Sequence, residues 1–373
     1  MNERIGIIGI GELPHRWERS ESLEEFVHEA SRETLSNAGV EREDIDNTVL
    51  CASDLEDGRA ISSMVAACPG GSYRKDMIKT TDTGIHALGL AAMRMEAGVF
   101  DTTLVMSWAK QSETNEPEIR KLEADPPYRR GTGLGHQTGH AVHATAYQAG
   151  QPAAMDAANH VVERNTTSAA ESDRGLPESA TSQSAAAESP VVSWPLREEH
   201  LPKPSDGAVG MVLVTESACE KLGADPVWLD GVGWETAGYD GSTFELGELE
   251  AATGAADSAY EEAGVTDPTT FDAAEIHSKN AFHELMVADA LGLPGNDDAA
   301  SAELDGAFDA GGSVPVNPSG GPYAGNPLIA TGLQRVAAAV RHIEDGADRT
   351  VAHATAGFTD QVHGVAVLNG RNA

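Results

Sequence analysis

Short apolar runs alternate with amphipathic segments along the first third of the chain. The apolar run at 5–10 predicts a buried strand, and residues 20–39 carry apolar side chains at helical spacing. Ser22 is placed to cap that helix and Gly39 to end it. The same patterns predict strands over 44–51 and 102–107 and helices over 60–68 and 84–98. Because strands and helices alternate, we expect an α/β fold.

Residues 111–200 interrupt this alternation, because they are rich in Glu, Ser, Ala, Thr and His and poor in large apolar side chains. We interpret them as an inserted loop region with helices over 139–149 and 154–164. The alternation then resumes, with predicted strands over 208–215, 227–233, 273–277, 350–354 and 363–368 and helices over 246–264 and 327–346. The repeated order predicts two similar halves, an N-terminal one over 1–225 that includes the loop region and a C-terminal one over 226–373.

Acidic residues dominate the charged positions, since 59 Asp and Glu against 25 Lys and Arg give a formal net charge of -34. Halophiles use such an excess of carboxylate to stay soluble, so we expect a halophilic source. The charge argues against nucleic-acid binding, which needs clustered Lys and Arg. No apolar run approaches the roughly 20 residues that span a bilayer, and the N-terminus lacks a basic signal region. We therefore expect a cytoplasmic protein that does not enter a membrane.

Several local patterns occur in order along the chain. They are IGIIGIG at 5–11, AGV at 38–40, DID at 44–46, SDGA at 205–208, EIH at 275–277, NPSGG at 317–321 and GNPLIATG at 325–332. With them, the chain resembles the thiolase superfamily, in particular its sterol-carrier-protein-type branch, which includes archaeal and haloarchaeal acetyl-CoA acetyltransferases. The resemblance implies the thiolase fold: two similar α/β halves in five layers with an inserted loop domain.

The resemblance also implies an enzyme that transfers acyl groups to and from coenzyme A, making or cleaving a 3-oxoacyl-CoA. The CoA thioester is then the substrate, and no cofactor is permanently bound. Such chemistry needs an activated nucleophile, a base and hydrogen-bond donors for two oxyanions. In the family the nucleophile is a cysteine at the start of a buried helix, whose dipole stabilises negative charge.

Three of the usual catalytic positions differ in this chain. By register with the family, Thr81 stands at the nucleophilic cysteine, Asn326 at the histidine of the "GHP" motif and Lys279 at the second cysteine. A threonine hydroxyl needs an adjacent base, and an asparagine amide cannot take a proton. The resemblance leaves His277 for the oxyanion hole and His353 as a candidate base. The predicted catalytic set is therefore Thr81, His277, His353 and Asn326.

Alternative interpretations of these histidines stay open. His277 can be a hydrogen-bonded loop residue, and His353 can be a partner of the backbone. Thr83 and His86 are three residues apart on a predicted helix, so they can form a dyad; otherwise His86 packs at a subunit interface.

A second histidine group and a glycine group add further expectations. His136, His140 and His143 have helical spacing, but without a carboxylate pattern we expect a solvated helix face and no metal. The loop glycines expected to pass close to bound pantetheine are Gly320, Gly321 and Gly325.

Two functions remain open at this stage. The first is a thiolase-type acyl-CoA acyltransferase with an atypical nucleophile. The second is a non-catalytic subunit that binds acyl-CoA or organises a thiolase complex. The resemblance implies further copies of this chain in a dimer or tetramer, and a small zinc-ribbon and OB-fold protein, as partners.

Overall fold

The computed structural model describes residues 3–128, 130–132, 135–238, 245–357 and 360–370. Its strands are β1 Ile5–Glu12, β2 Asn47–Cys51, β3 Asp76–Thr80, β4 Thr102–Ala109, β5 Val191–Ser193, β6 Leu196–Arg197, β7 Gly207–Thr215, β8 Val227–Thr236, β9 Ala273–Ile276, β10 Arg349–Ala356 and β11 Val362–Asn369. Its helices are α1 Leu23–Ala38, α2 Ser63–Ala66, α3 Gly84–Glu96, α4 Glu116–Glu123, α5 His136–Gly150, α6 Ala154–Glu171, α7 Gln183–Glu188, α8 Glu216–Leu222, α9 Glu250–Ala263, α10 Ala281–Ala290, α11 Ala299–Leu304, α12 Gly321–Ala324 and α13 Thr331–Glu344.

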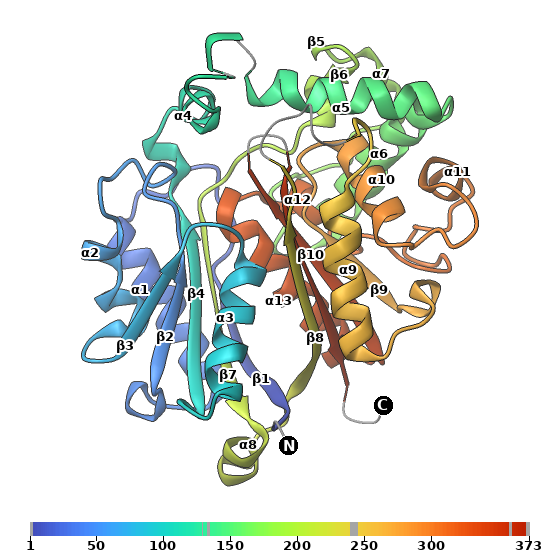
Figure 1. Cartoon of the computed structure of the whole chain (residues 1–373). Helices are drawn as coiled ribbons and strands as arrows, with labels where there is room; N and C mark the ends of the chain where they lie inside the picture. Colours follow the sequence, from blue (N-terminus) through green and yellow to red (C-terminus); the bar gives the residue numbers. More distant parts are fainter. Residues whose placement is uncertain (1–2, 129, 133–134, 239–244, 358–359, 371–373) are drawn as a thin grey trace.

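The main sheet repeats one strand pattern on either side of its middle. Its order is β3-β2-β4-β7-β1-β8-β11-β10-β9, and β1 meets β8 through a short antiparallel pairing (Figure 1). Outward from β1, the pairings with β7, β4 and β2 are antiparallel, antiparallel and parallel. Outward from β8, the pairings with β11, β10 and β9 follow the same sequence. The predicted architecture of two similar α/β halves is therefore confirmed.

Helices complete five layers around the two halves of the sheet. The buried helices α3 and α13 contact each other between the halves, while α1 and α9 cover the outer faces. Three apolar cores correspond to this arrangement: Leu88 and Leu333 belong to the middle one, Phe26 to the outer core under α1, and Phe282 to the core on the side of α9 and α10. Because each sheet half is covered on both faces, its strands are apolar runs, as the sequence patterns indicated.

Local chemistry explains where two of these helices begin and end. Ser22 caps α1 through a capping box with Glu25, and Gly39 ends it in the left-handed conformation at φ 67°. At the start of α3, Gly84 allows the close approach of α13, because a Cβ added there would lie 2.3 Å from the backbone nitrogen of Leu333. The glycine that resembles the family motif is thus required by the packing between the two halves.

The region 111–200 is a packed part of the molecule. Figure 1 shows α5, α6 and α7 in green over one end of the sheet, and α6 contacts α10, α11 and α12. Val161 and Val162 on α6 are fully buried in the core that contains Phe282. Arg164, from the same helix, donates to Glu284 at 2.7 Å and to Glu303 at 2.9 Å, and all three side chains are buried.

The sequence patterns did not predict the edge strand β3. It pairs in parallel with β2, yet Asp76 and Met77 at its start are exposed, so no apolar run marks it. The helix expected over 60–68 is shorter than expected, since α2 covers only Ser63–Ala66.

Removing the cation from the Arg164 cluster should destabilise the fold strongly. In Arg164→Met, Glu284 loses its charged partner and Glu303 keeps only His160, which is expected to cost about 3–5 kcal/mol of unfolding free energy. Arg4→Met, which removes a largely exposed partner of Asp230, should cost about 1 kcal/mol or less. Urea unfolding of both variants measures the difference, and equal losses would contradict a structural role for the Arg164 cluster.

Candidate functional site

Thr81 lies in the loop between β3 and α3, as the sequence predicted for the residue at the nucleophile position. The side chains of Thr81 and Asp82 are exposed, and Thr83 begins the helix as its N-cap. The Thr83 hydroxyl lies 2.8 Å from Nδ1 of His86, so these two side chains are neighbours, as the dyad hypothesis required. Burial lowers the pKa of His86, with Asp82 opposing the shift.

A small cleft of about 70 Å³ gathers loops from both halves around Thr81. These loops leave the carboxyl ends of β2, β3, β9 and β10, and a further one precedes α13. The lining residues are Ser53, Glu56, Thr81, Asp82, Lys279, Ile329, Thr355, Ala356 and Gly357. The positions of the family's two cysteines, Thr81 and Lys279, therefore face one shared space.

His277 and His353 lie directly behind this cleft. The His277 backbone N–H donates to the His353 carbonyl oxygen at 3.1 Å, and Nζ of Lys279 lies 3.4 Å from Nε2 of His277. Thr355, which lines the cleft, is two residues after His353 and projects from the same face of β10. Neither histidine lines the cleft, and the described residues offer the Thr81 hydroxyl no hydrogen bond.

Both histidines are neutral at ordinary pH. Burial lowers the pKa of His277 well below its usual value, and the cation of Lys279 lowers it further. Burial also lowers the pKa of His353 well below its usual value, with His363 adding to the shift. A neutral imidazole carries one N–H donor and one bare nitrogen, so each ring can donate one hydrogen bond and accept one proton.

Asn326 is occupied by structural contacts beside α13. Its side-chain oxygen accepts from the Thr331 hydroxyl at 2.8 Å, and its backbone N–H donates to the Ser205 hydroxyl at 3.0 Å. The Ser205 N–H in turn donates to the Asn326 carbonyl oxygen at 2.9 Å. Asn326 thus joins the two segments that carry the SDGA and GNPLIATG patterns, and its predicted catalytic role stays a prediction.

The three predicted loop glycines meet protein atoms. Gly320 and Gly321 have φ of 88° and 55°, and a Cβ on Gly320 would lie 2.7 Å from the backbone of Ala169. A Cβ on Gly325 would lie 2.3 Å from the ring of His15. Packing within the chain therefore favours glycine at these three positions, and their contact with pantetheine stays a prediction.

A buried group of histidines was missed by the sequence analysis. His140 and His143 were expected on a solvated helix face, which is wrong, because their exposed fractions are 2% and 3%. Nδ1 of His140 lies 2.7 Å from the carboxylate of Asp360, which Nε2 of His283 approaches to 3.6 Å. These residues are far apart in sequence, so no local pattern indicated that they meet. Among the described residues, no three such side chains are placed to hold a metal ion.

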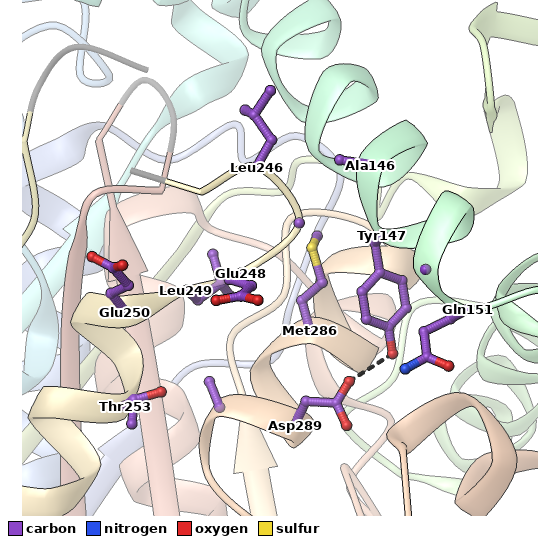
Figure 2. Close-up of a pocket in the computed structure, with 13 residues that line it drawn as sticks. Ala146, Tyr147, Gln151, Leu246, Glu248, Leu249, Glu250, Thr253, Met286 and Asp289 are labelled. Atoms are coloured by element: carbon purple, nitrogen blue, oxygen red, sulfur yellow. Dashed lines mark hydrogen bonds between the residues drawn. The ribbon is translucent and has the colours of Figure 1, made fainter. Parts of the chain in front are cut away.

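A larger pocket, of about 590 Å³, lies apart from Thr81, between α5, the start of α9 and α10. Figure 2 shows its wall, where the Tyr147 hydroxyl donates to the Asp289 carboxylate at 2.7 Å, with Glu248 and Glu250 nearby. None of the described residues that line it is basic, so it offers no partner for the phosphates of a nucleotide. Sequence reasoning did not anticipate this pocket.

Comparisons with known proteins support the thiolase resemblance. Residues 242–370 match the family described as thiolase C-terminal domain-like. Over 96% of both chains, the sequence is 24% identical to an acetyl-CoA acetyltransferase of Methanothermobacter thermautotrophicus. It is also 33% identical to human sterol carrier protein 2 over 36% of this chain and 25% of that protein.

Solved structures show the same fold at low sequence identity. The Ltp2-ChsH2(DUF35) aldolase superposes with a TM-score of 0.85 at 17% identity, over 99% of this chain and 98% of that one. A monomeric SCP2-thiolase-like protein type 1 from Mycobacterium smegmatis gives 0.77 at 18% identity, over 100% of this chain and 79% of that one. In the part of the chain that the structure describes, no helix has the length and apolar character needed to cross a membrane.

Acid should destabilise the fold through the buried histidines. Burial lowers the pKa of His363 from 6.5 to about 4, so between these values the folded chain holds fewer protons than the unfolded chain. The unfolding free energy should therefore fall as the pH drops from about 6.5 toward about 4, with His363 contributing up to about 1.4 kcal/mol per pH unit. Denaturant unfolding at several pH values measures this slope.

Two variants separate the contribution of His363 to this slope from that of the other titrating groups. His363→Gln should show a shallower slope than the unaltered protein, whereas His28→Gln, at an exposed position on α1, should not. An unchanged slope in His363→Gln would mean that this ring is not held neutral in the folded chain.

Proposed function

Because the chain belongs to the thiolase superfamily, on its sterol-carrier-protein-type branch, we propose that it acts on CoA thioesters as a thiolase-type acyl-CoA C-acyltransferase. It would form or cleave the carbon–carbon bond beside the thioester carbonyl group of a 3-oxoacyl-CoA. The observation that supports this best is the meeting of loops from both halves at one cleft, with Thr81 on one side and Lys279 on the other. His277 and His353 lie behind that cleft.

In the acyl-transfer step, the Thr81 hydroxyl oxygen attacks the thioester carbonyl carbon. The carbon–sulfur bond breaks, the hydroxyl proton passes to the leaving thiolate, and an acyl ester on Thr81 and free CoA result. The developing oxyanion needs donors, which the start of α3 and the ring N–H of His277 would supply. A hydroxyl nucleophile also needs a base, and Glu56 and Asp82 are the cleft-lining groups that can accept a proton.

In the carbon–carbon step, His353 takes the α-proton of a second acyl-CoA. The electron pair left on the α-carbon attacks the ester carbonyl on Thr81, so a 3-oxoacyl-CoA forms. The Thr81 oxygen leaves and regains a proton from protonated His353. The net reaction joins two acyl-CoA molecules into one 3-oxoacyl-CoA and one free CoA, and cleavage is its reverse.

A second candidate is an aldol-type reaction that needs no acyl-enzyme. Two observations favour it: the Thr81 hydroxyl has no hydrogen-bonded base among the described residues, and the fold matches the Ltp2-ChsH2(DUF35) aldolase over 99% of this chain. Here a base removes the hydroxyl proton of a 3-hydroxyacyl-CoA and the bond between the α- and β-carbons breaks. A carbonyl compound leaves, and the CoA enolate regains a proton on its α-carbon.

Partners and a cellular location are also proposed for this chain. The aldolase of similar fold is named together with a second component, ChsH2(DUF35), which supports our expectation of a partner protein for this chain. From the resemblance, we propose that this partner is a small zinc-ribbon and OB-fold protein. We also propose a homo-oligomer, a dimer or tetramer, in the cytoplasm of a halophile, where the net charge of -34 would maintain solubility.

Replacing Thr81 should decide between the two candidate reactions. Thr81→Val keeps the side-chain shape but removes the hydroxyl, so acyl-CoA-dependent release of free CoA should fall by roughly 10³-fold or more. Thr81→Ser, which keeps the hydroxyl, should retain most of the release. Mass spectrometry after exposure to acetyl-CoA should find an acetyl group on the peptide 79–88 only in chains with a hydroxyl at residue 81.

Other results have distinct meanings. If no acetyl group appears, and Thr81→Val still cleaves a 3-hydroxyacyl-CoA, the aldol-type reaction replaces acyl transfer. If calorimetry shows CoA thioester binding without either turnover, the chain is a non-catalytic binding or scaffold subunit. An acetyl group on Thr83 would assign the nucleophile to the Thr83–His86 dyad.

A further inference from the structure

A buried array of polar side chains includes His353, and most of its other members have no role in the acyl-transfer steps. It consists of His353 on β10, His363 on β11, Asp360 just before β11, His140 on α5 and His283 on α10. All five side chains are buried, with exposed fractions of 4% or less. The array thus brings the inserted region and the C-terminal half together directly under the cleft.

The hydrogen bonds in the array have a defined direction. Nε2 of His363 lies 2.6 Å from the carbonyl oxygen of Asp360, and a carbonyl oxygen only accepts, so this nitrogen carries the proton. Burial keeps the pKa of His363 at about 4, so the ring is neutral and its Nδ1 is bare. That bare nitrogen lies 2.9 Å from Nε2 of His353, which must therefore donate to it.

The proton on Nε2 also determines the state of Nδ1, the other ring nitrogen of His353. Because the ring is neutral and its proton is on Nε2, Nδ1 has a free lone pair. This atom is buried, and no described residue hydrogen-bonds to it. Unpartnered polar atoms inside a protein are rare, because leaving one costs about 1–3 kcal/mol. A buried bare nitrogen at this position is arranged as a proton acceptor would be.

Asp360 supplies the negative charge that such an acceptor needs. Burial would raise the pKa of its carboxyl group, but His140 and His283 hold it well below its usual value, so the group is ionised. Its backbone is in the left-handed region at φ 56°, which few residues other than glycine adopt. The stacked rings of His353 and His363, 5.2 Å apart, connect this charge to the bare nitrogen.

His277 provides the complementary donor. The ammonium group of Lys279 can only donate, so Nε2 of His277, 3.4 Å away, accepts and the ring proton is on Nδ1. Nδ1 of His277 is also buried and has no hydrogen-bond partner among the described residues. The residues that carry this free donor and free acceptor are backbone neighbours, where the end of β9 lies beside β10.

We propose that His363, Asp360 and His140 are positioning residues that hold His353 with its proton on Nε2, so that its Nδ1 can take the α-proton of a CoA thioester. The inference rests on the proposed function and extends it to residues outside the cleft. In this step the α-carbon–hydrogen bond breaks and an N–H bond forms on His353. The electron pair moves to the thioester oxygen, which accepts from His277, and the Asp360 carboxylate stabilises the imidazolium.

Exchange of the α-protons of acetyl-CoA with D₂O, followed by NMR, tests this step without any nucleophile. His363→Phe removes the acceptor for His353 and should slow exchange by about tenfold or more, with little change in the KM for acetyl-CoA. His363→Asn keeps an acceptor oxygen near the place of Nδ1 and should restore exchange to within about threefold of the unaltered protein. Asp360→Asn should slow exchange and move the acidic limb of its pH profile, which protonation of His353 sets, to lower pH, because the imidazolium loses its counter-charge.

Two controls keep the result interpretable. His200→Asn replaces another buried histidine, one bonded to Asn159 outside the array, and should leave exchange unchanged. Ring nitrogen-15 shifts of the ligand-free protein should show a bare Nδ1 on His353 in the unaltered protein and in His363→Asn. A protonated Nδ1, or exchange in His363→Phe as fast as in the unaltered protein, would overturn the proposal. If calorimetry finds no binding of acetyl-CoA, the proposed function fails, and the ring shifts alone decide whether the array orients His353.

Discussion

A single buried carboxylate, that of Glu284, connects the parts of the site. It accepts from Arg164 at 2.7 Å, from Asn165 and Asn317 at 2.8 Å, and from Ser278 at 3.0 Å. Burial raises the pKa of Glu284, with the cation of Arg164 opposing the shift. The ionised group is tolerated only because these donors replace its water. Since Ser278 lies between His277 and Lys279, this network fixes both site residues relative to the inserted helix α6.

A second buried carboxylate fixes the strand that leads into the site. Glu275 on β9 accepts from Arg335 on α13 at 2.8 Å and from the Ser319 hydroxyl at 2.7 Å, and His342 lies 2.8 Å from its other oxygen. Burial favours the neutral acid, but Arg335 and His342 hold the pKa of Glu275 below its usual value. Charged hydrogen bonds, at Glu275 and at Glu284, therefore hold both ends of the segment 275–284.

These clamps explain how much the sequence could predict. Two motif residues that carried the resemblance, Glu275 and Asn317, belong to the buried networks, so the patterns indicated the fold. The strand β3 was missed because an exposed edge strand needs no apolar run. The Asp360 array was missed for a different reason: its members pair across the fold, so their spacing in the sequence carries no signal. Register assigned Thr81 to the nucleophile position, and this role stays a prediction, because its reactivity depends on neighbours that only the folded chain brings together.

The two halves of the family's chemistry have different support in this molecule. Acyl transfer depends on a nucleophile in the loop before α3, where Thr81 has no hydrogen-bonded base among the described residues. Proton abstraction depends on the C-terminal half, where His277 offers a donor, His353 an acceptor and Asp360 a counter-charge. Three buried networks, around Glu284, Glu275 and Asp360, hold that second arrangement in place. Burying their charged groups costs free energy, a cost that apolar packing does not carry. Under the proposed function, formation of an enolate from a CoA thioester is therefore the step that these side chains would support best, and the fate of that enolate would depend on Thr81.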